Sequence, residues 1–272
     1  MDSVKALRIL SVIVLLSSAT AIAAESYNLY SNQIAVIEIK GEITSFVEIT
    51  KQMRIAIEDP KIKAIVLRVN SPGGRVQSVK EIREYVNLAR KSGKPVVSLI
   101  EDYSTSGAYY ICSASDYIYS HRNSITGSLG VIAIWIDESS KLEEEGVKVW
   151  VWKAGKFKDV GVPWRSPTPE EQRLLNQVTL EVYNELIEDI AEGRNLTVEY
   201  VKQFANGGSF DGEFAVEKGF ADEIGDYFDA LNKAAELAGI KEYLVVDLGK
   251  REGPHSFLTA IKALMRDPKL LS

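Results

Sequence analysis

The chain has few of the residues on which many hydrolases and metal sites depend. Its 272 residues include one cysteine, Cys112, and two histidines, His121 and His255. A single cysteine excludes an intrachain disulfide framework, and two histidines offer few places for a Ser-His-Asp or Cys-His catalytic group. No group of His, Cys, Asp and Glu has metal-ligand spacing, and no phosphate loop or dinucleotide motif is present. We therefore expect no metal and no cofactor.

Positive charge is also in short supply. The chain has 32 Lys and Arg against 38 Asp and Glu, which gives a net charge of −6. Nucleic-acid-binding proteins usually carry a basic stripe, so we expect no nucleic-acid partner. The composition, 46% apolar and 26% charged, is that of an ordinary globular protein. One folded domain, over residues 25–250, is the simplest expectation.

The first 24 residues differ from the rest of the chain. Lys5 and Arg8 precede an apolar run at 9–16, and small residues follow up to Ala24. This order is typical of a secretory signal, although the run is shorter than the roughly 20 residues that span a bilayer. Residues 1–24 are thus a cleaved signal, an uncleaved anchor or, as a third alternative, a buried helix. The first two place the protein at the cell membrane with its main domain on the extracytoplasmic side.

In the remainder of the chain, segments with a strand-like hydrophobic pattern alternate with segments in which apolar residues recur at helical spacing. Runs rich in β-branched residues predict strands at 33–39, 64–69, 96–100, 117–119, 131–134 and 147–152. Apolar residues at helical spacing predict helices at 46–59, 76–91 and 170–193. The apolar face of the last helix is expected to cover the core or a partner. Alternating strands and helices indicate an α/β layered fold with largely parallel strand pairing.

Ser106 and Lys158 are the candidate catalytic pair. A serine hydroxyl is a weak nucleophile that needs a base within hydrogen-bond reach. Lysine can be that base only when neutral, and its reference pKa of about 10.4 falls only in an apolar environment. We expect the wall around this lysine to come from a few apolar residues near it in sequence, namely Phe157, Val160, Val162 and Trp164. The hydroxyl of Ser128 is the candidate for orienting the amine.

The segment Ser71-Pro-Gly-Gly74 is expected to supply part of an oxyanion hole. It follows a predicted strand and precedes a predicted helix, and its glycines permit close backbone approach. The N–H groups of Gly74 and Gly107 would then face a carbonyl oxygen. Each feature alone has an ordinary structural explanation: the glycines as a turn, Ser106 as a helix N-cap and the lysines as solvated surface residues.

The order of these segments resembles the signal peptide peptidase A (SppA) family of serine/lysine peptidases. The matching motifs lie at 69–74, 105–110, 125–131 and 155–161, and the resemblance extends over about 34–225. It implies the following roles: nucleophile Ser106, general base Lys158, lysine-positioning hydroxyl Ser128, and oxyanion donors Gly74 and Gly107. Lys156 is the rival base. Lys158 is favoured because, like the family lysine, it directly precedes an aspartate.

The resemblance also implies a Clp protease/crotonase-like fold, a spiral of ββα units, and a membrane-facing ring, an octamer in similar proteins. Serine and lysine would then come from adjacent subunits, and the substrates would be cleaved signal peptides and similar apolar peptides. The C-terminal tail at 251–272, amphipathic over 255–266, is expected to pack on a neighbouring subunit or, as the alternative, on lipid. Two features depart from the family pattern. Glu101 and Asp102 lie where small apolar residues are usual, and Ala108 replaces a glycine.

Other functions fit parts of the same pattern. A related serine/lysine protease acting on stomatin-like membrane proteins would use the same chemistry on a different target. A crotonase-like acyl-thioester enzyme, or an inactive ring scaffold, would use the oxyanion turn without a nucleophile. The presence of Ser106, Ser128 and Lys158 together with an export signal argues against the last two.

Overall fold

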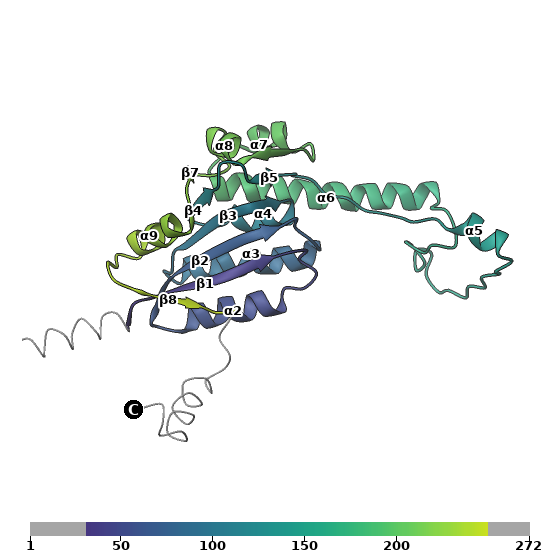
Figure 1. Cartoon of the computed structure of the whole chain (residues 1–272). Coiled ribbons are helices and arrows are strands. Elements are labelled where there is room, and N and C mark those ends of the chain that lie inside the picture. The colour runs from purple at the N-terminus through teal and green to yellow at the C-terminus, as the bar shows by residue number, and fades with distance from the viewer. Residues whose placement is uncertain (1–30, 250–272) are drawn as a thin grey trace, which may run out of the picture.

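The computed structural model describes residues 31–249, which form an α/β domain around one mixed sheet (Figure 1). The strands are β1 Gln33–Lys40, β2 Ile62–Ser71, β3 Val96–Thr105, β4 Tyr117–Ser120, β5 Ile125–Gly127, β6 Ser209–Asp211, β7 Glu223–Ile224 and β8 Leu244–Asp247. The helices are α2 Val47–Glu58, α3 Val76–Lys91, α4 Gly107–Cys112, α5 Ser139–Glu144, α6 Pro169–Arg194, α7 Val198–Phe204, α8 Gly212–Glu217 and α9 Tyr227–Leu237.

The main path of the sheet runs β6-β5-β3-β2-β1-β8, and β4 pairs with β3 and β7. Every pairing is parallel except that of β5 with β6. The prediction of an α/β fold with largely parallel strands is therefore confirmed. Strand β3 is long enough to pair with β4 through 97–100 and with β5 through 103–105. Its carboxyl end thus reaches past β4 toward β5.

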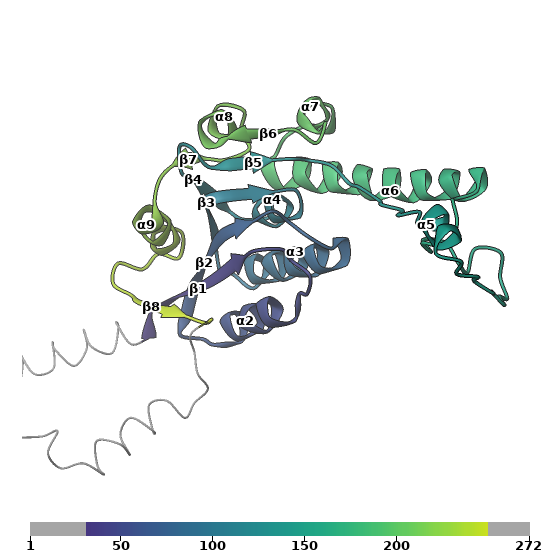
Figure 2. The ribbon, with the colours of Figure 1, turned by 45° about the vertical axis from the view of Figure 1, so that its right-hand side comes forward.

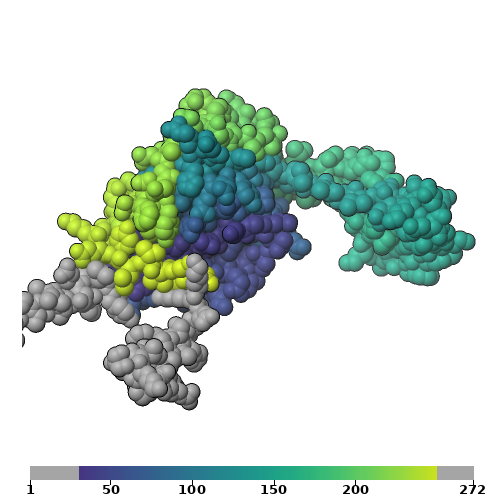
Figure 3. All heavy atoms as spheres, in the orientation of Figure 1, coloured from purple at the N-terminus to yellow at the C-terminus, as the bar shows by residue number. Residues whose placement is uncertain are grey.

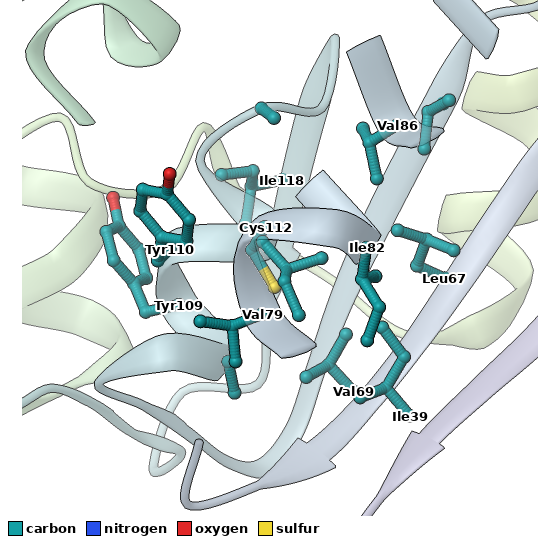
Figure 4. Close-up of a cluster of buried hydrophobic side chains, with 14 of the residues drawn as sticks. Ile39, Leu67, Val69, Val79, Ile82, Val86, Tyr109, Tyr110, Cys112 and Ile118 are labelled. Carbon is teal, nitrogen blue, oxygen red and sulfur yellow. The ribbon is translucent and has the colours of Figure 1, made fainter. Parts of the chain in front are cut away.

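Helices cover the two faces of the sheet unequally (Figure 2). Helices α2, α3 and α4 lie on one face, over a large buried cluster that includes Leu67, Val69 and Ile82. Figure 4 shows these side chains interdigitating with Val79 and Tyr109. The other face is covered by α9, over a smaller cluster around Ile34 and Val66. Because the central strands are buried on both sides, their sequences read as continuous apolar runs.

The predicted helices at 46–59 and 76–91 correspond to α2 and α3, and the predicted helix at 170–193 to α6. Only the C-terminal part of α6 packs on the core, through buried Leu186, Ile187 and Ile190. Further toward its N-terminus, Val178 and Leu180 are exposed. The predicted apolar face therefore packs on the core in the C-terminal half of this helix. Closer to the N-terminus its apolar residues are exposed.

The strands predicted at 131–134 and 147–152 are wrong, since both segments are irregular in the structure. They belong to residues 131–168, here called the arm, which carries α5 and stands apart from the body (Figure 3). Ile132 is 82% exposed and Trp152 is 87% exposed. A strand needs a neighbour for its backbone N–H and C=O groups, and neither segment has one in the described part of the chain. Apolar residues do alternate in these two segments, but no strand of the described chain pairs with either of them.

The expectations for residues 1–24 and 251–272 lie outside the described residues. Within residues 31–249, no helix combines the length and the apolar composition needed to cross a bilayer.

Leu67 provides a test of the core. It is fully buried in the middle of β2, whereas Leu88 on α3 is 48% exposed. We expect Leu67→Ala to lower the free energy of unfolding by about 2–5 kcal/mol, because it removes buried apolar surface and leaves a cavity. Leu88→Ala, the matched control, should cost less than about 1 kcal/mol. Denaturant unfolding of both variants measures the difference, and equal losses would contradict the described core.

Candidate active site

Ser106 occupies a sharp turn between β3 and α4. Its φ is 53° and its ψ −124°, a conformation that non-glycine residues rarely adopt. Its N–H donates to the carbonyl of Gly127 at 2.8 Å, and its carbonyl accepts from the N–H of Tyr110. Ser106 is the N-cap residue of α4, but its hydroxyl makes no capping hydrogen bond. The N-cap explanation therefore accounts for the position of Ser106 and leaves its hydroxyl unused. Strain of this kind is often concentrated at functional sites.

The Pro-Gly-Gly loop that follows β2 lies directly against this turn. A Cβ added to Gly73, whose φ is +93°, would lie 2.7 Å from the N of Gly107 and 3.2 Å from the Cβ of Ser106. The next residue, Gly74, forms a parallel bridge with Ile43, and a Cβ there would lie 2.2 Å from the Ile43 carbonyl oxygen. Glycine is required at both positions because a side chain would clash with neighbouring backbone atoms. The sequence analysis had singled out Gly74 and missed the contact made by Gly73.

Ser128 is brought to the same place by strand pairing. In the β3–β5 register Thr105 lies opposite Gly127, so the residues that follow the two strands, Ser106 and Ser128, are neighbours. Ser128 also has a positive φ, 50°. Its N–H donates to the carbonyl of Gly208 at 2.8 Å, and its hydroxyl donates to that of Gly207 at 3.2 Å.

A pocket of about 670 Å³ opens over these residues. Ser106, Gly107, Gly74 and Ser128 all line it, and this size is typical of small-ligand sites. Much of the wall is apolar and comes from α3, α6 and the start of the arm, with Val76, Val79, Val131, Leu180, Val182 and Leu186. The amide of Gly107 is in the first turn of α4, where backbone N–H groups have no acceptor within the helix. The pocket can therefore present a hydroxyl and a free amide to an apolar chain.

Lys158 does not line this pocket. It lies on the arm, where it is exposed and its amine has no hydrogen-bond or ion-pair partner among the described residues. Its neighbour Lys156 is instead paired with Glu170. Within residues 31–249, the apolar wall expected around Lys158 does not form, since the lysine is exposed. The structure thus brings Ser106, Ser128, Gly74 and Gly107 together and leaves the predicted base outside.

The length of α6 shows how large the separation is. Lys156 contacts this helix at Glu170, whereas the pocket contacts it between Thr179 and Leu186. At 1.5 Å per residue, the nine residues from position 170 to 179 span about 14 Å. A lysine side chain is shorter than that span, so the part of the arm that contacts Glu170 lies outside the pocket.

Charged groups hold the base of the arm to the start of α6. Asp159 is buried and accepts from Lys153 at 2.5 Å and from Arg165 at 3.0 Å. Hydrogen bonds from Arg165, and then from Lys153, hold the pKa of Asp159 well below its usual range. Arg165 also pairs with Glu171 at 2.6 Å, which lowers the pKa of Glu171 to about 2. These contacts give the segment around Lys158 a defined fold despite its exposure.

A second polar cluster lies behind the Ser106 turn, and no sequence pattern indicated it. The hydroxyl of Tyr110, on α4, donates to Asp189 of α6 at 2.5 Å. Arg83 of α3 is buried, lies 4.9 Å from the centre of the Tyr110 ring, and donates to the Asp189 carbonyl at 2.6 Å. Burial, and then the bond to Asp189, raise the pKa of Tyr110 above its usual value. The cluster joins the catalytic turn to α6.

Glu101 and Asp102 lie away from the pocket. Arg68 on β2 donates to Glu101 at 2.8 Å, and Asn70 donates to Asp102 at 2.8 Å. Both carboxylates are therefore occupied by the neighbouring strand and do not line the pocket.

Cys112 is fully buried, and burial raises its thiol pKa to about 11. His121 is exposed directly after β4. Within residues 31–249, no three His, Cys, Asp or Glu side chains are grouped so that they could hold a metal ion.

A strained serine at a strand-to-helix turn, with glycine amides beside it in an apolar pocket, is the arrangement of a serine hydrolase. The model of Peptidase family S49 matches residues 88–241. The chain belongs to this family, and it is similar to proteins named as proteases of the SppA type.

Several relatives support the assignment. A protein named as a protease in Methanocaldococcus jannaschii is 37% identical over 74% of this chain and 64% of its own length. A protein named as signal peptide peptidase SppA in Enterococcus faecium is 34% identical over 71% of this chain and 57% of its own length. A protein named as a protease in Synechocystis is 38% identical over 76% of this chain and 75% of its own. The chain therefore spans less than two thirds of the first two relatives.

The contact between the glycine loop and the nucleophile turn can be tested with a matched pair of variants. Gly73→Ala would push a methyl group into the amide of Gly107, whereas Gly93, with a similar φ of +81°, has nothing within 4 Å of an added Cβ. We expect Gly73→Ala to reduce kcat/KM for peptide hydrolysis about 100-fold, the size of effect seen when one oxyanion donor is lost. Gly93→Ala shares the backbone strain and should keep most activity. Similar losses in both variants would contradict a specific contact.

Proposed function

We propose that the protein is a membrane-associated serine endopeptidase in which Ser106 of one copy is activated by Lys158 of an adjacent copy. The observation that carries this proposal is the position of the arm. It holds an exposed lysine without a partner on the described chain, while the lysine that lines the pocket of Ser106, Lys80, is paired with Glu185. A second copy that brings its arm to this pocket would complete the pair and would bury the lysine.

The proposed reaction is acyl transfer through a covalent intermediate. The neutral amine of Lys158 takes the proton of Ser106 while the hydroxyl oxygen attacks the scissile carbonyl. The amides of Gly74 and Gly107 stabilise the oxyanion, and Ser128 orients the amine. The protonated lysine then gives its proton to the leaving amine as the peptide bond breaks. Water, activated by the same lysine, finally attacks the ester, which releases the acid and restores the serine.

Assembly into a ring is supported by the apolar surface of the arm. Ile132, Ile134 and Ile136 alternate along one segment, and Trp150 and Trp152 lie on another, all of them largely exposed. Exposed apolar surface of this extent often marks a protein–protein contact. In the proposed oligomer these residues are covered by neighbouring subunits. The proposal also includes the fold of each domain, a spiral of ββα units as in the Clp protease/crotonase superfold.

The apolar pocket favours extended, largely apolar peptides, such as cleaved signal peptides, as substrates. A location at the cell membrane with the catalytic domain on the extracytoplasmic side fits these substrates and the signal-like residues 1–24. The relative named as signal peptide peptidase supports the same class. Stomatin-like membrane proteins are the alternative target, and cleavage profiling with both kinds of substrate separates the two.

Mixing two inactive variants tests the shared site. We expect Ser106→Ala and Lys158→Ala each to abolish turnover of an apolar fluorogenic peptide. Co-assembled in equal amounts, they should regain about a quarter of wild-type activity, because a random mixture pairs an intact serine with an intact lysine at one site in four. The control is Lys156→Ala, which removes a nearby lysine and should retain turnover.

The variants must first be shown to assemble like the wild type. No recovery in the mixed oligomer would place serine and lysine in the same chain, and loss of activity in Lys156→Ala alone would move the base to that residue. A wild-type protein that assembles and cleaves nothing would favour the scaffold alternative.

The pH dependence follows from the proposed base. Only the neutral lysine can accept the serine proton, so kcat/KM should rise with pH between roughly pH 6 and pH 9. Initial rates across this range, in buffers of constant ionic strength, measure the profile. A flat profile would contradict a lysine base.

A further inference from the structure

The pocket contains one charged pair that the proposed mechanism does not use. Lys80 on α3 and Glu185 on α6 both line the pocket, and they form an ion pair with each other. Their side chains are 35% and 47% exposed. In a wall that is otherwise largely apolar, this pair is the group able to distinguish charged from apolar substrate side chains.

The pair lies close to the reacting atoms. Val79, the residue before Lys80, lies against the nucleophile turn, since a Cβ on Gly107 would meet a Val79 methyl carbon at 2.6 Å. One turn beyond Lys80, Arg83 contacts Tyr110 and Asp189. The pair thus bridges α3 and α6 beside the first turns of α4. A P1 side chain, which belongs to the residue that supplies the scissile carbonyl, would meet this pair on entering the pocket between α3 and α6.

The two ionic contacts between α3 and α6 differ in how deeply their side chains are buried. Arg83 is 4% exposed, and Asp189 holds both it and Tyr110. Removal of the Asp189 carboxylate there would leave the buried charge of Arg83 without its ionic partner, which is destabilising. Lys80 and Glu185 are half-exposed, so one can be replaced while water solvates the other. A change at this pair therefore alters the pocket without removing the support of α4.

We propose that the Lys80–Glu185 pair sets the P1 preference of the protease. While paired, the two charges satisfy each other and the pocket accepts apolar side chains. An unpaired charge in the same place attracts the opposite charge and repels its own kind. Loss of Lys80 therefore selects basic P1 residues, and loss of Glu185 selects acidic ones. This inference rests on the proposed function, because it assigns a substrate position to the same site.

The test uses the full-length assembled protein and peptides that differ only in Leu, Lys or Glu at P1. We expect Lys80→Ala to raise the Lys/Leu ratio of kcat/KM about tenfold, and Glu185→Ala and Glu185→Gln to raise the Glu/Leu ratio by a similar factor. The charge reversal Lys80→Glu with Glu185→Lys should restore the preference for Leu. Unchanged ratios, shifts in the same direction for both residues, or a change at another substrate position would overturn the proposal.

Two controls separate this proposal from the proposed function. The Lys233–Glu236 pair lies on α9, over the opposite face of the sheet, so Lys233→Ala and Glu236→Ala should leave every ratio unchanged. Peptide affinities measured in a Ser106→Ala background report the preference without turnover. Shifted affinities with no wild-type turnover would support the pocket assignment and reject the catalytic one. Normal turnover with unshifted kcat/KM ratios and unshifted peptide affinities would support the proposed catalytic function and reject the assignment of P1 preference to the Lys80–Glu185 pair.

Discussion

The structure depends on the parallel pairing of β2 with β3. Both strands end at the same edge of the sheet, with Ser71 opposite Ser104, so the loop after one and the turn after the other must meet. Gly73 is the contact point, since no side chain fits between the loop and the amide of Gly107. Strand β5 then continues the same edge and adds Ser128. The register of the sheet thus fixes the position of the Ser106 turn, and the helices beneath it supply the support.

The second determinant is the continuous helix α6. Its C-terminal half packs on the core beside α4, whereas its N-terminal cap is tied to the arm through Arg165 and Glu171. One helix therefore carries a wall of the pocket along its middle and, at its N-terminal end, contacts the arm that holds the predicted base. This geometry explains how a single chain can contain all five predicted site residues and yet assemble only four of them.

The sequence predicted the parts of the structure that are controlled by local pattern. The residues of α3 have helical periodicity and an abrupt glycine end at Gly93, and its bounds agree with the prediction. Ser106 was identified by the motif around it. The strands expected at 131–134 and 147–152 failed because strand formation needs a partner, and periodicity does not say whether one exists. Asp189 and Glu185 were missed because a charge on a helix face is normally solvated, and only the folded chain shows what lies opposite.

The exposed arm has a further consequence for when the protein becomes active. Under the proposed mechanism, a newly folded copy carries its nucleophile in one place and its base in another, so it cannot cleave the chains around it. Many proteases prevent early activity with an inhibitory propeptide that is later removed. Here the distance imposed by α6 would by itself have the same effect, and activity would begin when copies of the protein associate. The local concentration of subunits would then serve as the activating signal.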